Sequence, residues 1–234
     1  MDLNSGCNMK LNELLSDGNK ENTVFSSKGD ALEALELYKK AIYLGERSSQ
    51  IYYNMAICME TIGKISDVIK WLDRAIKVDG NNIKAILKKG QILMDMENLK
   101  DSLSCYNKVL KIDGKNVQAY HYKTILNYEL ENVKEAYSTL EEAESIIGEN
   151  ILFHSDRAML YEREKRYNEA LQCLDNGLKI DNNNITLLQE KALILISIQK
   201  IEEAKKIFDE IFEVEPNNVE VKFSKASLCL FNNT

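Results

Sequence analysis

Residues 151–184, ILFHSDRAMLYEREKRYNEALQCLDNGLKIDNNN, form one period of a repeat that governs most of this 234-residue chain. The last residue of the period is an Asn that recurs every 34 positions, at Asn82, Asn116, Asn150, Asn184 and Asn218. Each Asn therefore closes a unit, and the units are 49–82, 83–116, 117–150, 151–184 and 185–218. A fixed period of this length indicates stacked supersecondary units rather than one globular core.

Small and large side chains recur at set places in the period. Two helices approach most closely where side chains are small, so small residues at positions 8 and 20 predict a tight antiparallel helix hairpin. Apolar residues at positions 24 and 30 lie near one helix face, and we predict that both positions are buried in the second helix. Position 8 holds Ala56, Gly90, Thr124, Ala158 and Ala192; position 20 holds Val68, Ser102, Ala136, Ala170 and Ala204; position 24 holds Leu72, Tyr106, Leu140, Leu174 and Phe208; position 30 holds Val78, Ile112, Ile146, Ile180 and Val214.

Residues typical of helix ends close each unit. They tolerate the left-handed conformation or are unable to continue a helix, as in Gly80-Asn81-Asn82 and Pro216-Asn217-Asn218. A carboxylate also recurs at position 19, early in the second helix, where it interacts favourably with exposed amide groups. These carboxylates are Asp67, Asp101, Glu135, Glu169 and Glu203.

Several positions of the period carry the residue types of a known repeat family. Tyr52 and Tyr120 stand at position 4, Tyr106 and Phe208 at position 24, and Pro216 at position 32. With the small residues at positions 8 and 20, the pattern resembles the tetratricopeptide repeat. The resemblance implies an all-α fold, a right-handed superhelical solenoid of antiparallel helix hairpins. Repeat 117–150 is the least regular, because Asn127 and Ile147 depart from the family pattern at positions 11 and 31.

The two ends of the chain differ from the regular repeats. We expect a flexible tail over 1–14 and a degenerate first repeat over 15–48, in which 29–42 fits a second helix and the first helix is irregular. Residues 219–234 are expected to form a C-terminal capping helix with a polar outer face. Phe223, Leu230 and Phe231 on this helix fit an anchor pocket, a self-association surface or a frayed end that folds over the groove.

The resemblance also implies a binding surface. In this family, positions 2, 5, 6, 9, 12 and 13 line a concave groove, and exposed aromatic and Met side chains mark interaction surfaces. Tyr53, His121, Tyr122 and Tyr128 are the strongest candidates, although some of them could instead pack together across repeats. The full predicted peptide-binding set is Tyr53, Asn54, Ile57, Lys84, Leu87, Lys88, Gln91, His121, Tyr122, Ile125, Tyr128, Met159, Glu162 and Phe223.

One known mode of binding in the family is only half represented. Co-chaperones with these repeats clamp the acidic tail of a chaperone with Lys, Asn and Arg side chains from three repeats. Asn54, Lys84 and Lys88 fall on three of those places, but Asn19 and Thr23 do not complete the first repeat. A chaperone-tail clamp is therefore disfavoured, and a local basic spot at Lys84 and Lys88 is expected instead.

Basic residues recur at position 7. They could form an anion-binding ladder, but we favour a structural role in which their methylene groups pack at the helix interface and their charges reach water or a carboxylate. The residues are Lys89, Lys123, Arg157, Lys191 and Lys225.

Catalytic and metal-binding motifs are not found in the sequence. The two histidines, His121 and His154, lie on different repeats, and His154 takes the core position that Tyr holds elsewhere. There is no phosphate-binding glycine loop, no nucleophile elbow and no H-x-x-x-H pair. We predict that the protein is not an enzyme and needs no cofactor and no metal.

The composition indicates the kind of partner. A formal charge of −7 argues against nucleic acid and anionic lipid, which reward clustered basic residues. No apolar run approaches the roughly 18 residues that span a bilayer, so a cytoplasmic protein with no membrane contact is expected. The five cysteines are expected to be buried reduced thiols.

These features predict a scaffold or adaptor that binds another protein or peptide, as an extended segment or a helix, in the concave groove. Two alternatives remain open. One is a homodimer that self-assembles through the C-terminal helix, and the other is a non-catalytic regulatory subunit of an enzyme complex.

Overall fold

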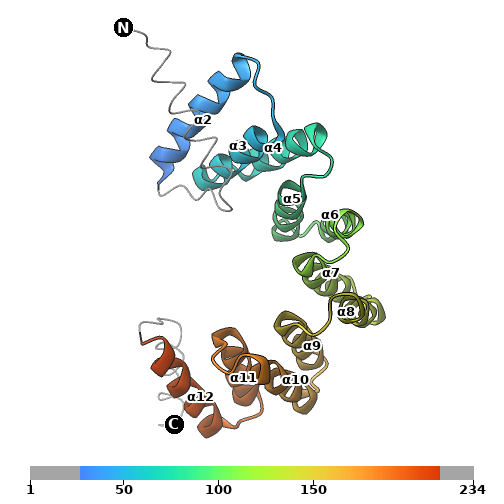
Figure 1. Cartoon of the computed structure of the whole chain (residues 1–234). Helices are drawn as coiled ribbons and strands as arrows, with labels where there is room; N and C mark the ends of the chain where they lie inside the picture. Colours follow the sequence, from blue (N-terminus) through green and yellow to red (C-terminus); the bar gives the residue numbers. More distant parts are fainter. Residues whose placement is uncertain (1–26, 217–234) are drawn as a thin grey trace. The chain divides into compact units, whose positions relative to one another are not determined.

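A computed structural model describes residues 27–216, which form α-helices joined by short turns (Figure 1). The helices are α2 (Lys28–Tyr43), α3 (Ser49–Ile62), α4 (Ile65–Val78), α5 (Ile83–Asp95), α6 (Leu99–Ile112), α7 (Val117–Glu129), α8 (Val133–Ile147), α9 (Ile151–Arg163), α10 (Tyr167–Ile180), α11 (Ile185–Ser197) and α12 (Ile201–Val214). These residues contain no strand. The fold is an all-α helical solenoid, as predicted.

Three predictions fall wholly or partly outside the described residues. They are the tail at 1–14, the first helix expected within 15–28, and the capping helix at 219–234 that includes Phe223. The helix expected over 29–42 lies within α2, whose first turn is capped because the Ser27 hydroxyl accepts a hydrogen bond of 3.1 Å from the Asp30 amide.

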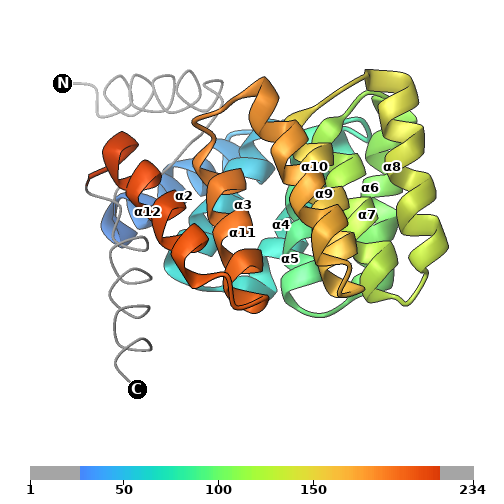
Figure 2. The same cartoon turned by 90° about the horizontal axis from the view of Figure 1, so that it is seen from below.

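The chain divides into two compact units between Ala119 and Tyr120. Unit 1 contains α2 to α6, and unit 2 contains most of α7 and all of α8 to α12. Within unit 1, α3 packs against α4 and α5 against α6. Within unit 2, α9 packs against α10, which lies alongside it in Figure 2, and α11 packs against α12. Each hairpin thus pairs the two helices of one repeat.

Small side chains stand where the helices of a hairpin cross, as predicted. Ala158 and Ala170 are 1% and 0% exposed and belong to one buried cluster. Unit 1 has a closer contact: the Ser102 hydroxyl donates a 2.7 Å hydrogen bond to the Gly90 carbonyl oxygen. A Cβ added at Gly90 would lie 2.9 Å from the Tyr106 ring, so a larger residue here would force the ring to shift.

The prediction for the buried face of the second helix is half right. Position 24 is buried in all five repeats, with Leu72, Tyr106, Leu140, Leu174 and Phe208 between 0% and 2% exposed. The prediction that position 30 is buried was wrong. Val78, Ile146, Ile180 and Val214 are 42% to 52% exposed, and Ile112 is only half-buried. Positions 20, 24 and 27 follow the spacing of one helical stripe, whereas position 30 lies at its edge. Position 27 is the third buried place, occupied by Ala75, Val109, Ala143, Gly177 and Ile211.

A left-handed residue ends the first helix of each repeat. Gly63 has φ 88°, and its equivalents have φ between 59° and 65° although none is glycine. The amide of the following residue donates a 2.8 Å hydrogen bond to a carbonyl five residues earlier, as from Lys64 to Met59 and from Arg166 to Tyr161. This is the Schellman geometry, which satisfies carbonyls at the end of a helix. The four non-glycine residues are Glu97, Glu131, Lys165 and Gln199.

The prediction for the turns between repeats holds only in part, because Gly148 has a positive φ of 93° and two other closing glycines do not. Gly80 and Gly114 do not have a positive φ, so the left-handed conformation is not what they supply. Instead, the Asp79 carboxylate accepts a 2.9 Å bond from the Asn81 amide, and the Asn82 side chain accepts a 2.9 Å bond from the Ala85 amide. The recurring Asn is therefore the N-cap of the next first helix.

The structural interpretation of the basic residues at position 7 is confirmed for the described residues. Each side chain reaches a carboxylate on a second helix, and none stands in an open anion-binding row. The pairs are Lys89 with Asp73 at 2.6 Å, Lys123 with Glu142 at 3.5 Å, Arg157 with Glu144 at 2.8 Å and Lys191 with Asp175 at 2.6 Å. Lys225 lies outside the described residues.

Candidate peptide-binding surface

The first helices of four repeats, α3, α5, α7 and α9, carry the predicted binding residues that the structure describes. Lys84 is exposed, Asn54 is buried, and Phe223 lies outside the described residues. The rest are half-buried: Tyr53, Ile57, Leu87, Lys88, Gln91, His121, Tyr122, Ile125, Tyr128, Met159 and Glu162. Most of the predicted set is thus neither core nor fully solvated.

In unit 1, polar residues of this surface bond to one another. The Asn54 amide nitrogen donates to the Tyr38 hydroxyl at 3.2 Å, and its oxygen accepts from the Gln50 amide at 2.8 Å. The Lys88 ammonium lies 2.7 Å from the Glu60 carboxylate, one repeat earlier. The expected basic spot is therefore reduced, because the charge of Lys88 is compensated.

In unit 2, the same surface contains a buried carboxylate that the sequence analysis did not single out. Asp156 on α9 is 2% exposed, and its Oδ1 lies 2.5 Å from His121 Nδ1 on α7. Its second oxygen, Oδ2, is buried and has no hydrogen-bond partner among the described residues. His121 also packs its ring against Tyr122, with the ring centroids 4.9 Å apart. His121 is therefore held by the neighbouring repeat rather than facing a groove alone.

A second contact of the same kind joins the next two first helices. The Ser155 hydroxyl on α9 lies 2.8 and 2.9 Å from the two carboxylate oxygens of Glu190 on α11. Both contacts link residues 35 apart, which are position 5 of one repeat and position 6 of the next. This spacing is visible in the sequence once the period is known, and it was the signal that could have revealed Asp156 and Glu190.

Burial makes the negative charge on these carboxylates unfavourable. It raises the pKa of Asp156 above the usual range, against the opposing effect of the bond to His121. Burial also raises the pKa of Glu190, the Ser155 hydrogen bond lowers it, and the nearby charges of Asp156 and Glu162 raise it further. Asp156 and Glu190 therefore share one region of the first-helix surface of unit 2, and the charge of Glu162 acts on Glu190.

Tyr128 is partly covered by a residue of the following repeat. The Arg163 guanidinium lies over the Tyr128 ring, 5.2 Å from its centroid, and also pairs with Glu129. Tyr53, in unit 1, has a pKa raised first by burial and then by the charge of Glu60. The contact between Tyr128 and Arg163 joins two repeats, which fits the alternative that some of these aromatic residues pack across repeats.

The described residues offer little for catalysis. No group of three His, Cys, Asp or Glu side chains among them is placed to hold a metal ion. Burial raises the pKa of the Cys58 thiol to about 12, and raises those of Cys105 and Cys173, which disfavours the nucleophilic thiolate. All three cysteines are free; Cys58 and Cys173 are buried and Cys105 is half-buried. His154 is half-buried, with Nε2 3.2 Å from a Glu149 oxygen.

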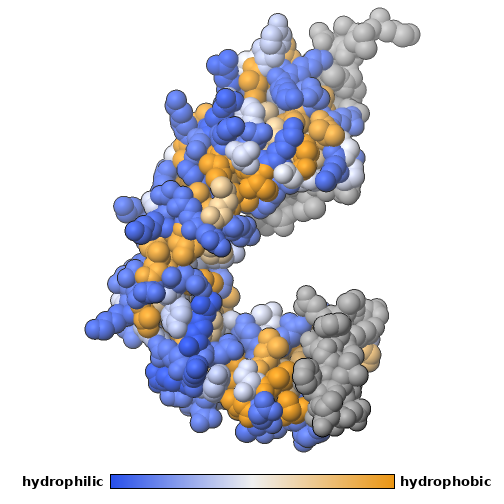
Figure 3. Space-filling model, turned by 180° about the vertical axis from the view of Figure 1, so that it is seen from behind, coloured by the Kyte–Doolittle hydropathy of each residue, from blue (hydrophilic) through white to orange (hydrophobic). Residues whose placement is uncertain are grey.

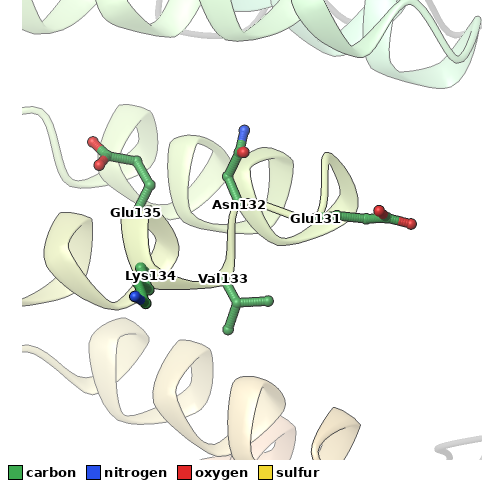
Figure 4. A pocket seen from close by; sticks show the side chains of 5 residues that line it. All are labelled: Glu131, Asn132, Val133, Lys134 and Glu135. Atoms are coloured by element: carbon green, nitrogen blue, oxygen red, sulfur yellow. The ribbon is translucent and has the colours of Figure 1, made fainter.

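The surface of the molecule adds two observations. A depression of about 600 Å³ lies at the turn between α7 and α8, but its lining side chains, Glu131 to Glu135, point in different directions and do not converge (Figure 4). Hydrophobic patches alternate with hydrophilic side chains on the face drawn in Figure 3.

Between residues 27 and 216, no helix has both the length and the apolar character needed to cross a membrane.

Comparison with known families matches two parts of the chain. Models of the tetratricopeptide repeat match residues 83–116 and 161–228. The first match coincides with one period of the repeat. The chain is a tetratricopeptide repeat protein. Proteins with this repeat generally mediate protein–protein interactions, and the repeat is typically a non-catalytic scaffold.

Solved structures with the same fold are also tetratricopeptide repeat proteins. One from Parabacteroides merdae has a TM-score of 0.71 at 16% identity, over 88% of this chain and 80% of that one. A thermophilic protein of Thermus thermophilus has a TM-score of 0.65 at 16% identity, over 78% and 100%. YrrB, described as having an unusual peptide-binding site, has a TM-score of 0.51 at 18% identity, over 82% and 99%. At such identities the likeness shows the fold alone. No curated protein matches the sequence.

Proposed function

We propose that this tetratricopeptide repeat protein is an adaptor or scaffold that binds an extended peptide or a helix of a partner protein on the surface of its first helices. The observation that carries the proposal is a row of apolar side chains at position 9 in unit 2. Ile125 and Met159 are half-buried, and Leu193 is 54% exposed. Apolar side chains that gather on adjacent helices outside the core are typical of interaction surfaces.

Charge supports a protein partner. The basic residues at position 7 are engaged with carboxylates on the second helices, so they do not form the open cationic stripe that nucleic acid requires. Association as a homodimer through the C-terminal helix, a role as a regulatory subunit and a cytoplasmic location remain predictions from the sequence.

A pull-down from the source cell tests the proposal. The baits are the wild-type chain, a double variant Ile125→Glu/Met159→Glu on the first helices of unit 2, and Ile180→Glu as a control. Ile180 lies on α10, a second helix, and is 48% exposed, so the control adds charge at a comparable apolar site on the other layer.

We expect the partners captured by wild type to be retained by Ile180→Glu and lost with the double variant. Circular dichroism first establishes that all three baits are equally helical. If the double variant captured the same partners as wild type, the first-helix surface of unit 2 would not be the binding surface.

A further inference from the structure

The first-helix surface of unit 2 carries more negative charge than its own residues compensate. Asp156 and Glu190 both stand at position 6, on the contacting helices α9 and α11, and the charge of Glu162 acts on Glu190 against that of His121. The basic residues of α7 and α9 point to other partners. Lys123 pairs with Glu142, Arg157 with Glu144, and Arg163 with Glu129.

The buried carboxylate of Asp156 has unused capacity for hydrogen bonds. His121 occupies one of its oxygens, while Oδ2 is buried and has no partner among the described residues. A buried acceptor without a donor is unfavourable by an amount comparable to a lost hydrogen bond, and more so when it is charged. Such an oxygen would accept a hydrogen bond from a partner that displaces the side chains covering it.

The surroundings of the cluster indicate what that donor is attached to. The position 9 row of Ile125, Met159 and Leu193 lies one helical turn after the residues at positions 5 and 6. Apolar side chains in this place would contact the methylene groups of a long cationic side chain. A metal ion fits less well, because no group of three ligands converges among the described residues.

We propose that the cluster of Asp156, Glu162 and Glu190 receives the cationic end of a lysine or arginine side chain of the partner peptide, next to an apolar residue that contacts the position 9 row. This subsite rests on the proposed function, since it specifies the chemistry of the peptide. Arginine fits best, because its five N–H donors can bond two carboxylates at once. The raised pKa values of Asp156 and Glu190 agree, since a bound cation relieves the cost of their ionised forms.

The matching surface of unit 1 provides an internal contrast. Asn54 and Lys88 occupy position 6 there, the Asn54 amide is bonded at both ends, and Lys88 is paired with Glu60. Those repeats therefore present no comparable buried acidic cluster, and the cation is assigned to unit 2.

A selection of random 12-residue peptides displayed on phage tests the proposal with the full chain as bait. We expect the retained peptides to be enriched in lysine or arginine adjacent to an apolar residue. A synthetic copy of a retained peptide, labelled with fluorescein, then provides its Kd by fluorescence anisotropy. Replacing its arginine by uncharged citrulline should weaken binding about tenfold, the effect of losing one charged hydrogen bond.

Variants of the chain locate the effect. Glu190→Gln keeps an acceptor for Ser155 and should weaken binding of the arginine peptide about tenfold, with little further loss for the citrulline peptide. Glu162→Gln provides a second variant if Glu190→Gln does not fold. Glu141→Gln, exposed on α8 in the other helix layer, makes the same charge change and should leave the affinity as it is.

The outcomes separate the two proposals. If peptides were retained without enrichment in basic residues, or if Glu190→Gln and Glu162→Gln both bound them as tightly as wild type, the cation subsite would be wrong and peptide binding would stand. If no peptide were retained at all, the proposed function itself would fail, and the subsite with it.

Discussion

The first helices of unit 1 and unit 2 are α-helices of 13 or 14 residues that differ in surface chemistry. In unit 1, Lys88 is neutralised by Glu60 at 2.7 Å. In unit 2, the equivalent position holds Asp156, which keeps a buried oxygen without a partner among the described residues, and Glu190. The repeats keep small and apolar residues at positions 8, 20 and 24 while position 6 varies in charge, so binding specificity is to be sought in the positions that depart from the period.

The largest expected difference between the units concerns glycines in tight contacts. Gly90→Ala in unit 1 places a Cβ 2.9 Å from the Tyr106 ring and 3.2 Å from the Cys105 Cβ, both inside a packed crossing. Overpacking of about 1–3 kcal/mol, offset by about 1 kcal/mol of helix propensity, predicts a net loss of up to about 2 kcal/mol in the free energy of unfolding.

Gly177→Ala in unit 2 is the matched substitution. Its Cβ would lie 2.7 Å from Leu187 Cδ1, the mobile end of a flexible side chain, and 3.2 Å from the His154 Cβ. We expect a smaller loss, within about 1 kcal/mol, because Leu187 can change rotamer. Urea unfolding followed by circular dichroism measures both variants, and equal losses would show that the Leu187 contact is as rigid as the ring contact.

An intermediate effect is expected at the turn inside each hairpin. Lys165 in unit 2 has φ 61°, a conformation that is unfavourable for residues with a Cβ, whereas Gly63 in unit 1 has φ 88° without that cost. Lys165→Gly should raise the free energy of unfolding by about 0.5–1 kcal/mol, and Gly63→Ala should lower it by about 1 kcal/mol. Thermal melts of the two variants check the opposite signs, and destabilisation by Lys165→Gly would mean that its side chain contributes more than its backbone costs.

The smallest effect concerns the dependence of stability on pH. The folded chain holds a proton on Glu190 at pH values where the unfolded chain has lost it, because burial and then the nearby carboxylates raise the pKa of Glu190. The contribution of Glu190 to stability therefore falls as the pH rises from the ordinary glutamate range through the raised pKa. Glu190→Gln has no such penalty, so it should be more stable than wild type at neutral pH, and the difference should close near pH 4.

Denaturant unfolding at several pH values measures this difference. Glu60→Gln in unit 1 is the control, because it breaks the pair with Lys88 and should be no more stable than wild type at neutral pH. A wild-type chain that is more stable than Glu190→Gln at pH 7 would contradict the unfavourable charge at this site, and would weaken the argument for the cation subsite.

Much of the scaffold follows from the sequence, since the small residues at positions 8 and 20 and the apolar residues at position 24 report local requirements of a helix hairpin. Ala158 and Leu174 are buried for the reason that their spacing predicts. Position 30 was misplaced because an apolar residue at the edge of a helical stripe has the same composition as one inside it. Residue type also fails to predict the conformation of the turns inside the hairpins. Lys165 adopts a left-handed conformation that is uncommon for residues with a Cβ.

The period, the two helices of each repeat and the assignment of most residues to core or surface can be derived from the sequence, because they depend on neighbours along the chain. Which polar side chains meet depends on the folded arrangement of the helices. His121 and Asp156, like Ser155 and Glu190, lie on separate helices and come together through the stacking of one repeat on the next. Contacts between helices depend on the approach of whole repeats, and it is this approach that buries Asp156 and leaves one of its oxygens in need of a donor.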